Sequence, residues 1–161
     1  MNTDFIVLAN RIRETVGELE QTIKRVERAT LLAKQYQEDV DLYIDAIALN
    51  LHDFYTGLER LFRLIGATVD RSTPASESWH RDLLDQMCLD LPPIRPRVLS
   101  EQTCAALADF LRFRHVVRNV YAFQLDGDRV NQLAQKARAV HHQVSTELRD
   151  FADYLDQLGR L

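Results

Sequence analysis

The sequence is poor in the residues that interrupt secondary structure or mark special chemistry. Its 161 residues include only 5 glycines, 4 prolines and 2 cysteines. Hydrophobic residues make up 46% and charged residues 27%, an ordinary composition for a globular protein long enough to bury a core. We therefore expect residues 1–161 to form a single domain.

An excess of positive charge and the common metal-binding patterns are also missing. The 20 basic and 24 acidic residues give a formal net charge of -4, so any phosphate site must come from a local patch. The sequence contains no HxH, no HExxH and no carboxylate cluster of the two-metal type. His141 and His142 are adjacent and point about 100° apart on a helix, which makes them a poor chelate. We expect no metal and no cofactor.

Long hydrophobic runs and paired cysteine motifs are absent too. The N-terminal apolar run extends only from Phe5 to Ala9, whereas a signal peptide needs a longer run and a membrane span needs about twenty apolar residues. Cys88 and Cys104 lie far apart and match no metal or redox spacing. We expect a cytoplasmic protein without a membrane segment, whose cysteines are buried thiols in a reducing compartment.

Helical periodicity is what the sequence does contain. Apolar residues recur at steps of three and four in three long segments, and no comparable stretch alternates with a period of two. The three apolar seams consist of Leu8, Ile12, Leu19, Ile23, Val26 and Thr30; of Ile44, Ile47, Leu51, Phe54, Leu58, Leu61 and Ile65; and of Val130, Leu133, Ala137, Val140, Val144, Leu148, Phe151, Leu155 and Leu158.

Capping residues divide the chain into about five helices. Gly66 suits the end of the second helix, and Thr73 followed by Pro74 suits the start of the third. After a rigid extended linker, LPPIRPRVLS, Ser100 can cap the fourth helix, and Asp126 or Asp128 can cap the fifth. Five helices with mostly short connections predict an all-α, mainly antiparallel bundle.

Residues 112–123, RFRHVVRNVYAF, combine strong polar groups with apolar ones. At about 100° per residue, Arg114, His115, Arg118, Asn119 and Tyr121 gather on one side of a helix. The complementary arc holds Phe110, Phe113, Val116, Val117, Val120 and Phe123. Two guanidiniums one turn apart repel each other unless an anion or carboxylates lie between them, and their fork shape suits phosphate.

Two interpretations of this polar face remain open. Arg114 and Arg118 can pair with acidic residues of neighbouring helices while Tyr121 caps the core, as on an ordinary charged helix face. Against this, the segment has no acid between Asp109 and Asp126, which favours an anion site.

Other polar residues have ordinary interpretations with functional alternatives. Glu59 is expected in a surface ion pair, the alternative being a contact that holds Arg114 or Arg118. Tyr55 is expected in the core with its hydroxyl at the rim. Trp79 is expected to anchor the bundle, and His80 is a less favoured candidate for a second base.

The polar segment resembles the signature of HEPN-domain ribonucleases, specifically of HepT-like toxins from prokaryotic toxin–antitoxin pairs. That signature has an arginine, a polar residue directly after it, a histidine a few residues on and a tyrosine two positions later. These positions fall on Arg114, His115, Asn119 and Tyr121, so asparagine replaces the signature histidine. LNLHDFYTGLERLFRLIG and ESWHRDLLDQM extend the resemblance over most of residues 44–126.

The resemblance implies a metal-independent endoribonuclease that uses the 2′-hydroxyl of RNA as its nucleophile. Arg114 and Arg118 would hold the phosphate, with Arg112 at the edge of the polar arc in contact with RNA or water. Asn119 cannot titrate, so the acid–base role would pass to His115 while Asn119 positions the substrate.

The same resemblance implies partners. It predicts a homodimer whose paired motif helices form one groove, and a minimal nucleotidyltransferase antitoxin that adenylylates Tyr121. The alternatives are a non-catalytic HEPN module that binds nucleotide, RNA or a nucleotidyltransferase, and a structural helical adaptor.

Overall fold

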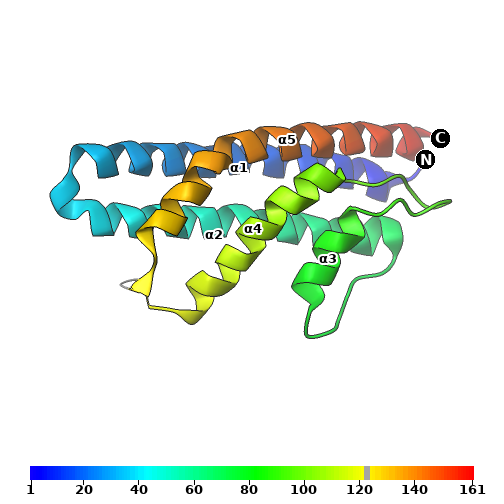
Figure 1. Ribbon diagram of the computed structural model, residues 1–161. Coiled ribbons are helices and arrows are strands. Elements are labelled where there is room, and N and C mark those ends of the chain that lie inside the picture. Colours follow the sequence, from blue (N-terminus) through cyan, green and yellow to red (C-terminus); the bar gives the residue numbers. More distant parts are fainter. Residues whose placement is uncertain (122–123) are drawn as a thin grey trace.

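The computed structural model describes residues 1–121 and 124–161, which fold into five α-helices and form no sheet. They are α1 (Thr3–Gln35), α2 (Val40–Ile65), α3 (Trp79–Met87), α4 (Glu101–Asn119) and α5 (Gly127–Arg160). Three long helices lie side by side, with α1 antiparallel to both α2 and α5, and the two termini meet at one end (Figure 1). The shorter α3 and α4 pack on α2 and on each other. The predicted all-α, mainly antiparallel bundle is confirmed.

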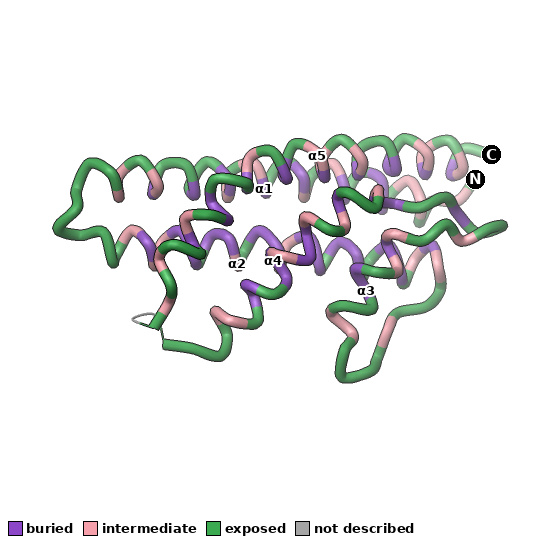
Figure 2. Tube along the Cα trace, viewed as in Figure 1, coloured by how far each residue is buried: buried purple, intermediate pink, exposed green. Residues whose placement is uncertain are grey.

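The three apolar seams form the core. Nearly all their members are buried, and Figure 2 shows the buried residues on the sides of the long helices that face one another. Only Thr30 and Leu158 are partly exposed. The largest fully buried side chains come from α2 and α4, namely Tyr55, Phe54, Phe62, Phe110 and Phe113. The aromatic part of the core therefore lies under α4, the helix that carries the polar segment.

The caps expected for the last two helices are present. The Ser100 hydroxyl accepts a hydrogen bond from the Thr103 backbone N–H at 3.2 Å, and the Asp126 carboxylate accepts one from the Asp128 N–H at 3.0 Å. Side-chain oxygens satisfy N–H groups that have no partner within the helix. Of the two aspartates left open by the sequence, Asp126 is the cap of α5.

Gly66 follows the last residue of α2, as expected, but not in the left-handed conformation typical of a glycine cap. Its φ is -57°, and the left-handed residue is Arg71, with φ 56°. A Cβ on Gly66 would lie 3.0 Å from the Ser72 carbonyl oxygen. Glycine is therefore required here for space rather than for its backbone freedom.

The predicted start of the third helix at Thr73 is wrong, because α3 begins at Trp79. The preceding chain is tied elsewhere: the Ser72 N–H donates to the Gly66 carbonyl at 3.1 Å. The hydroxyl of Ser76 then donates to the Asp82 carboxylate at 2.8 Å. These bonds hold residues 72–78 against the end of α2 and the first turn of α3, so the helix starts one turn later than its proline suggests.

The cysteines are also not the free thiols that the sequence predicts. Cys88 and Cys104 form a disulfide with their Cα atoms 6.4 Å apart, joining the end of α3 to the first turn of α4. The intervening linker folds back on itself, which places two residues that are distant in sequence side by side. Spacing alone could not reveal this, because it depends on how the linker turns.

That linker is pinned by a buried ion pair. The Arg95 guanidinium donates from Nε to Asp70 Oδ1 at 2.5 Å and from Nη2 to Asp70 Oδ2 at 2.8 Å. Its remaining donors reach the carbonyls of Leu89, Gln86 and Pro96. Because every charge and donor is satisfied, the pair can remain buried in the turn between α3 and α4.

A charge cluster joins the middle of α1 to α5. Arg138 donates to both carboxylate oxygens of Glu20, at 2.8 and 2.6 Å. His141 is buried with Nε2 3.0 Å from Glu20, whereas the adjacent His142 is exposed. Burial lowers the pKa of His141, outweighing the nearby Glu20 carboxylate that raises it.

Within the described ranges, no helix combines the length and the apolar character needed to cross a membrane.

Replacing Arg95 by alanine is expected to reduce the free energy of unfolding by about 3 to 5 kcal/mol, because it leaves the Asp70 carboxylate buried without its partner. Urea unfolding followed by circular dichroism measures the change. Arg97→Ala is the matched control, since Arg97 forms an exposed pair with Asp90 at 3.5 Å and its loss should cost no more than about 1 kcal/mol. Equal losses in the two variants would contradict the structural role of Arg95.

Lowering the pH from about 7.5 to about 5.5 is expected to destabilise the protein through His141. The unfolded chain binds a proton near the ordinary histidine pKa, whereas burial disfavours the charged ring in the folded protein. The free energy of unfolding should therefore fall as pH falls, and His141→Gln should weaken this dependence. His142→Gln is the control, and an unchanged pH slope in His141→Gln would exclude the effect.

Candidate functional site

The polar segment lies on the last two turns of α4 and on the chain that follows it. The helix ends at Asn119, with Val120 already extended, so a helical projection does not apply beyond that residue. Tyr121 therefore leaves the face on which the sequence placed it. Phe123, expected on the apolar arc, lies outside the described residues. Val120 and Tyr121 lie outside the helix, and of the five residues placed on the polar side, Arg114, His115, Arg118 and Asn119 keep helical spacing.

Arg114 is buried, not solvated as the projection suggested. Only 5% of the residue is exposed, and Nη2 lies 3.8 Å from Oε1 of Glu59 on α2. Its Nε is buried and has no hydrogen-bond partner among residues 1–121 and 124–161. The expectation that Arg114 pairs with an acid of a neighbouring helix is correct, but this single long contact leaves guanidinium donors unused.

Glu59 is the centre of the cluster. It is 5% exposed, and its second oxygen, Oε2, accepts a hydrogen bond from Nδ1 of His80 at 2.7 Å. One buried carboxylate thus links Arg114 of α4 with His80 of α3. The expected surface ion pair is wrong, and the alternative contact with Arg114 is the correct one. The contacts of Glu59 with the Arg114 guanidinium and the His80 ring compensate for its loss of hydration.

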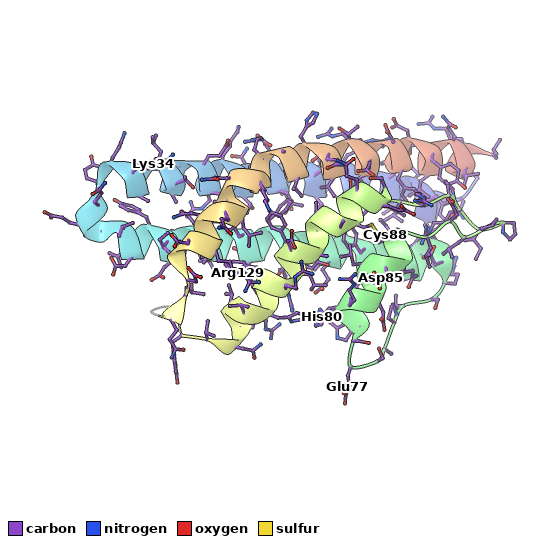
Figure 3. The ribbon with its side chains drawn as sticks, viewed as in Figure 1. Lys34, Glu77, His80, Asp85, Cys88 and Arg129 are labelled. Carbon is purple, nitrogen blue, oxygen red and sulfur yellow. A yellow bond between two sulfur atoms is a disulfide. The ribbon has the colours of Figure 1, made fainter. Side chains whose placement is uncertain are left out.

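His80 is held on three sides. Besides its bond to Glu59, its ring stacks on Trp79 with centroids 3.6 Å apart. Its edge meets the ring of His115 at 5.4 Å with an interplanar angle of 82°. Figure 3 shows His80 at the end of α3 that faces α4. The guanidinium of Arg63 lies over the far side of Trp79, 5.0 Å from the ring centroid, so the stack is packed from both faces.

His115 is poised to be neutral. Partial burial lowers its pKa, and the nearby charges of Arg114 and Arg118 lower it further, against the opposite effect of Glu59. A neutral imidazole has one nitrogen free to accept a proton. The group expected to carry acid–base chemistry therefore stands beside a buried arginine in a form suited to act as a base.

Three of the predicted site residues lie apart from this cluster. The Asn119 side-chain amide donates to the His115 backbone carbonyl at 2.6 Å, so it satisfies its own helix end. Arg112 pairs with Asp109 on the same helix. Tyr121 is 72% exposed beyond the helix end, and the idea that it caps the core is wrong. Arg118 is exposed on the last turn, close enough to influence His115.

One feature of the sequence could have indicated that Glu59 lies on a buried face of α2. Tyr55 and Phe62, four residues before it and three after it, are both buried, which places Glu59 on an apolar face of α2. The Tyr55 hydroxyl lies in the core without a partner in the described chain, not at the rim as expected, and burial raises its pKa. The sequence offered His80 only as a less favoured candidate for a second base, because its position depends on where α3 begins.

The described residues contain no group of three or more histidine, cysteine or acidic side chains arranged to hold a metal ion.

Comparison with known proteins identifies a family that this chain matches. The profile of a family described as HepT-like protein matches residues 46–155, a range that includes Glu59, His80 and the whole of α4. No curated protein and no solved structure matches the chain. The matched range covers most of the sequence and all the residues of the cluster. The chain belongs to the HepT-like family of HEPN-domain proteins.

Proposed function

We propose that the protein is a metal-independent endoribonuclease that cleaves RNA by using the 2′-hydroxyl as nucleophile. The observation that carries the proposal is Arg114, a nine-tenths buried guanidinium whose Nε has no partner among the described residues, next to the imidazole of His115. A buried cation with unused donors stabilises an anion far better than a solvated one, because water does not screen it.

Each group has a defined task in this reaction. His115 removes the proton from the 2′-hydroxyl, which then attacks the neighbouring phosphorus. Arg114 stabilises the negative charge that grows on the phosphoryl oxygens in the transition state. Arg118, exposed on the next turn, binds the RNA backbone and fixes the position of the RNA strand along α4. Arg112 can join it only after releasing Asp109.

A homodimer would concentrate positive charge at one place, although the net charge of the assembly stays negative. With a formal charge of -4, a single chain has no general attraction for RNA. Two copies of the end of α4 brought together would surround one strand with arginines from both protomers. We propose this assembly for a cytoplasmic protein.

The same function includes control by a nucleotidyltransferase antitoxin. Tyr121 is 72% exposed just after α4, where a modifying enzyme can reach its hydroxyl. A nucleotide added there would place negative charge beside Arg118 and compete with the RNA phosphate. In this proposal the protein is the toxin of a toxin–antitoxin pair, and its modified form is inactive.

Purified protein with unmodified Tyr121, checked by mass spectrometry, is expected to cleave labelled total RNA and tRNA in excess EDTA. Arg114→Ala should reduce the rate by about 100-fold or more, as for loss of a group that stabilises a transition-state anion. His115→Ala should reduce it by roughly 100- to 10,000-fold. His142→Ala, which removes an exposed histidine on α5, is the control and should remain near wild type.

Circular dichroism must show that the variants are folded, and Arg114→Lys keeps the buried charge if the alanine variant unfolds. No cleavage by unmodified wild type would overturn the nuclease proposal. The protein would then be a non-catalytic module that binds RNA, nucleotide or a nucleotidyltransferase.

A further inference from the structure

We propose that His80 is a second catalytic residue, which donates the proton to the leaving 5′-oxygen, and that Glu59 is its positioning residue. The inference rests on the proposed ribonuclease function and adds the group that completes it. Cleavage through the 2′-hydroxyl needs two proton transfers, and the signature position that would supply another histidine is occupied by Asn119. A second titratable group must come from elsewhere in the fold.

The Glu59–His80 pair has the geometry of an oriented imidazole. A carboxylate can only accept, so Nδ1 of His80 carries the hydrogen in the 2.7 Å bond to Glu59. This fixes the ring and leaves Nε2 on the opposite side, with no hydrogen-bond partner in residues 1–121 and 124–161. A carboxylate behind one nitrogen holds the ring in place and stabilises the positive charge when the other nitrogen is protonated.

The position of His80 relative to His115 fits a shared substrate. The two rings come from α3 and α4, and their edge-to-face contact at 5.4 Å leaves them within reach of one phosphodiester. Arg114 is paired with the same Glu59 carboxylate that holds His80. The side chain of His80 is 18% exposed, so the ring is fixed by packing but is open to a ligand at its edge.

The surroundings of His115 and His80 differ, and each suits a different proton transfer. His115 has two arginines nearby, which favour its neutral form and therefore the role of base. His80 has a buried carboxylate on Nδ1, which holds the ring in one orientation and leaves Nε2 as the nitrogen for proton transfer to the leaving group. Pairs of titratable groups in opposite environments are the usual arrangement for acid–base catalysis at one site.

The reaction balances with these groups alone. The 2′-oxygen forms a bond to phosphorus as its proton passes to His115, and the bond from phosphorus to the 5′-oxygen breaks as His80 gives that oxygen a proton. The products are a 2′,3′-cyclic phosphate and a 5′-hydroxyl. His115 ends protonated and His80 neutral, and proton exchange with water restores both rings.

A purely structural His80 would explain less. A histidine that only bridges α3 to Glu59 has no need of an unpartnered nitrogen at the substrate side, next to a second imidazole and an unsatisfied guanidinium. The His80 ring stacks on Trp79, and Arg63 packs on that tryptophan, so the orientation of the His80 ring is fixed. A residue that donates a proton in catalysis needs such support, because its nitrogen must be directed at one atom of the substrate.

Two substrates that differ in their leaving group test the proposal. A dinucleotide has an alkoxide leaving group that needs a proton, whereas uridine 3′-(4-nitrophenyl phosphate) releases a phenolate that does not. His80→Gln should slow the dinucleotide by roughly 100- to 10,000-fold and leave the nitrophenyl ester near wild type. His115→Ala should slow both substrates, because both need a base. His142→Ala, an exposed histidine on α5, should slow neither.

Glu59→Gln should lower the dinucleotide rate less than His80→Gln does and should slow the dinucleotide more than the nitrophenyl ester. A residue with a purely structural role would change stability without changing that selectivity. In His80→Gln the Glu59 carboxylate stays buried without its histidine partner, which can destabilise the variant. The double variant Glu59→Gln/His80→Gln removes this buried charge and must keep the same substrate selectivity.

Each outcome separates the two proposals. Equal loss on both substrates in His80→Gln, or no loss on either, would overturn the role of His80 while leaving the ribonuclease proposal intact. Wild-type protein inactive on both substrates and on RNA would overturn the ribonuclease function and the role of His80 with it.

Discussion

The buried carboxylate of Glu59 is the interaction on which the rest of the site depends. It touches Arg114 at 3.8 Å and His80 at 2.7 Å, so one side chain of α2 fixes groups on α3 and α4. A buried guanidinium without an acid would be costly, and so would the acid without its cations. Because each member compensates for the others, the burial of the three is interdependent, and the Nε of Arg114 has no hydrogen-bond partner in the described part of the chain.

Much of the fold followed from periodicity, and the failures have one cause. The seams of Ile44 to Ile65 and of Val130 to Leu155 are buried as spacing predicts, because a long amphipathic helix specifies its own buried face. The start of α3 and the pairing of Cys88 with Cys104 were missed. Both depend on how residues 66–100 fold back on α2, which is decided by contacts such as Arg95 with Asp70 rather than by local sequence.

The sequence identified only some of the residues of the candidate site. A signature on one helix identified Arg114 and His115, whose spacing is local. Glu59 and His80 come from other helices, and only tertiary packing brings them to α4. The projection also failed for Tyr121, because the helix ends at Asn119, whose amide binds the His115 carbonyl. A short polar side chain near a helix end often competes for backbone groups in this way. A helical projection does not take such hydrogen bonds into account.

The Cys88–Cys104 bond has a practical consequence for any solution study. α3 has 9 residues, fewer than the roughly 12 that an isolated helix needs to be stable in water, so it relies on its attachments. The disulfide fastens its last turn to α4, and the Glu59–His80 bond fastens its first. A sample kept with reducing agent therefore lacks the disulfide, and a sample kept without it has the disulfide intact. The two forms differ in how firmly α3, and with it His80, is held. Assays on mixtures of the two would average their rates, and counting free thiols beside each assay would identify which molecule was measured.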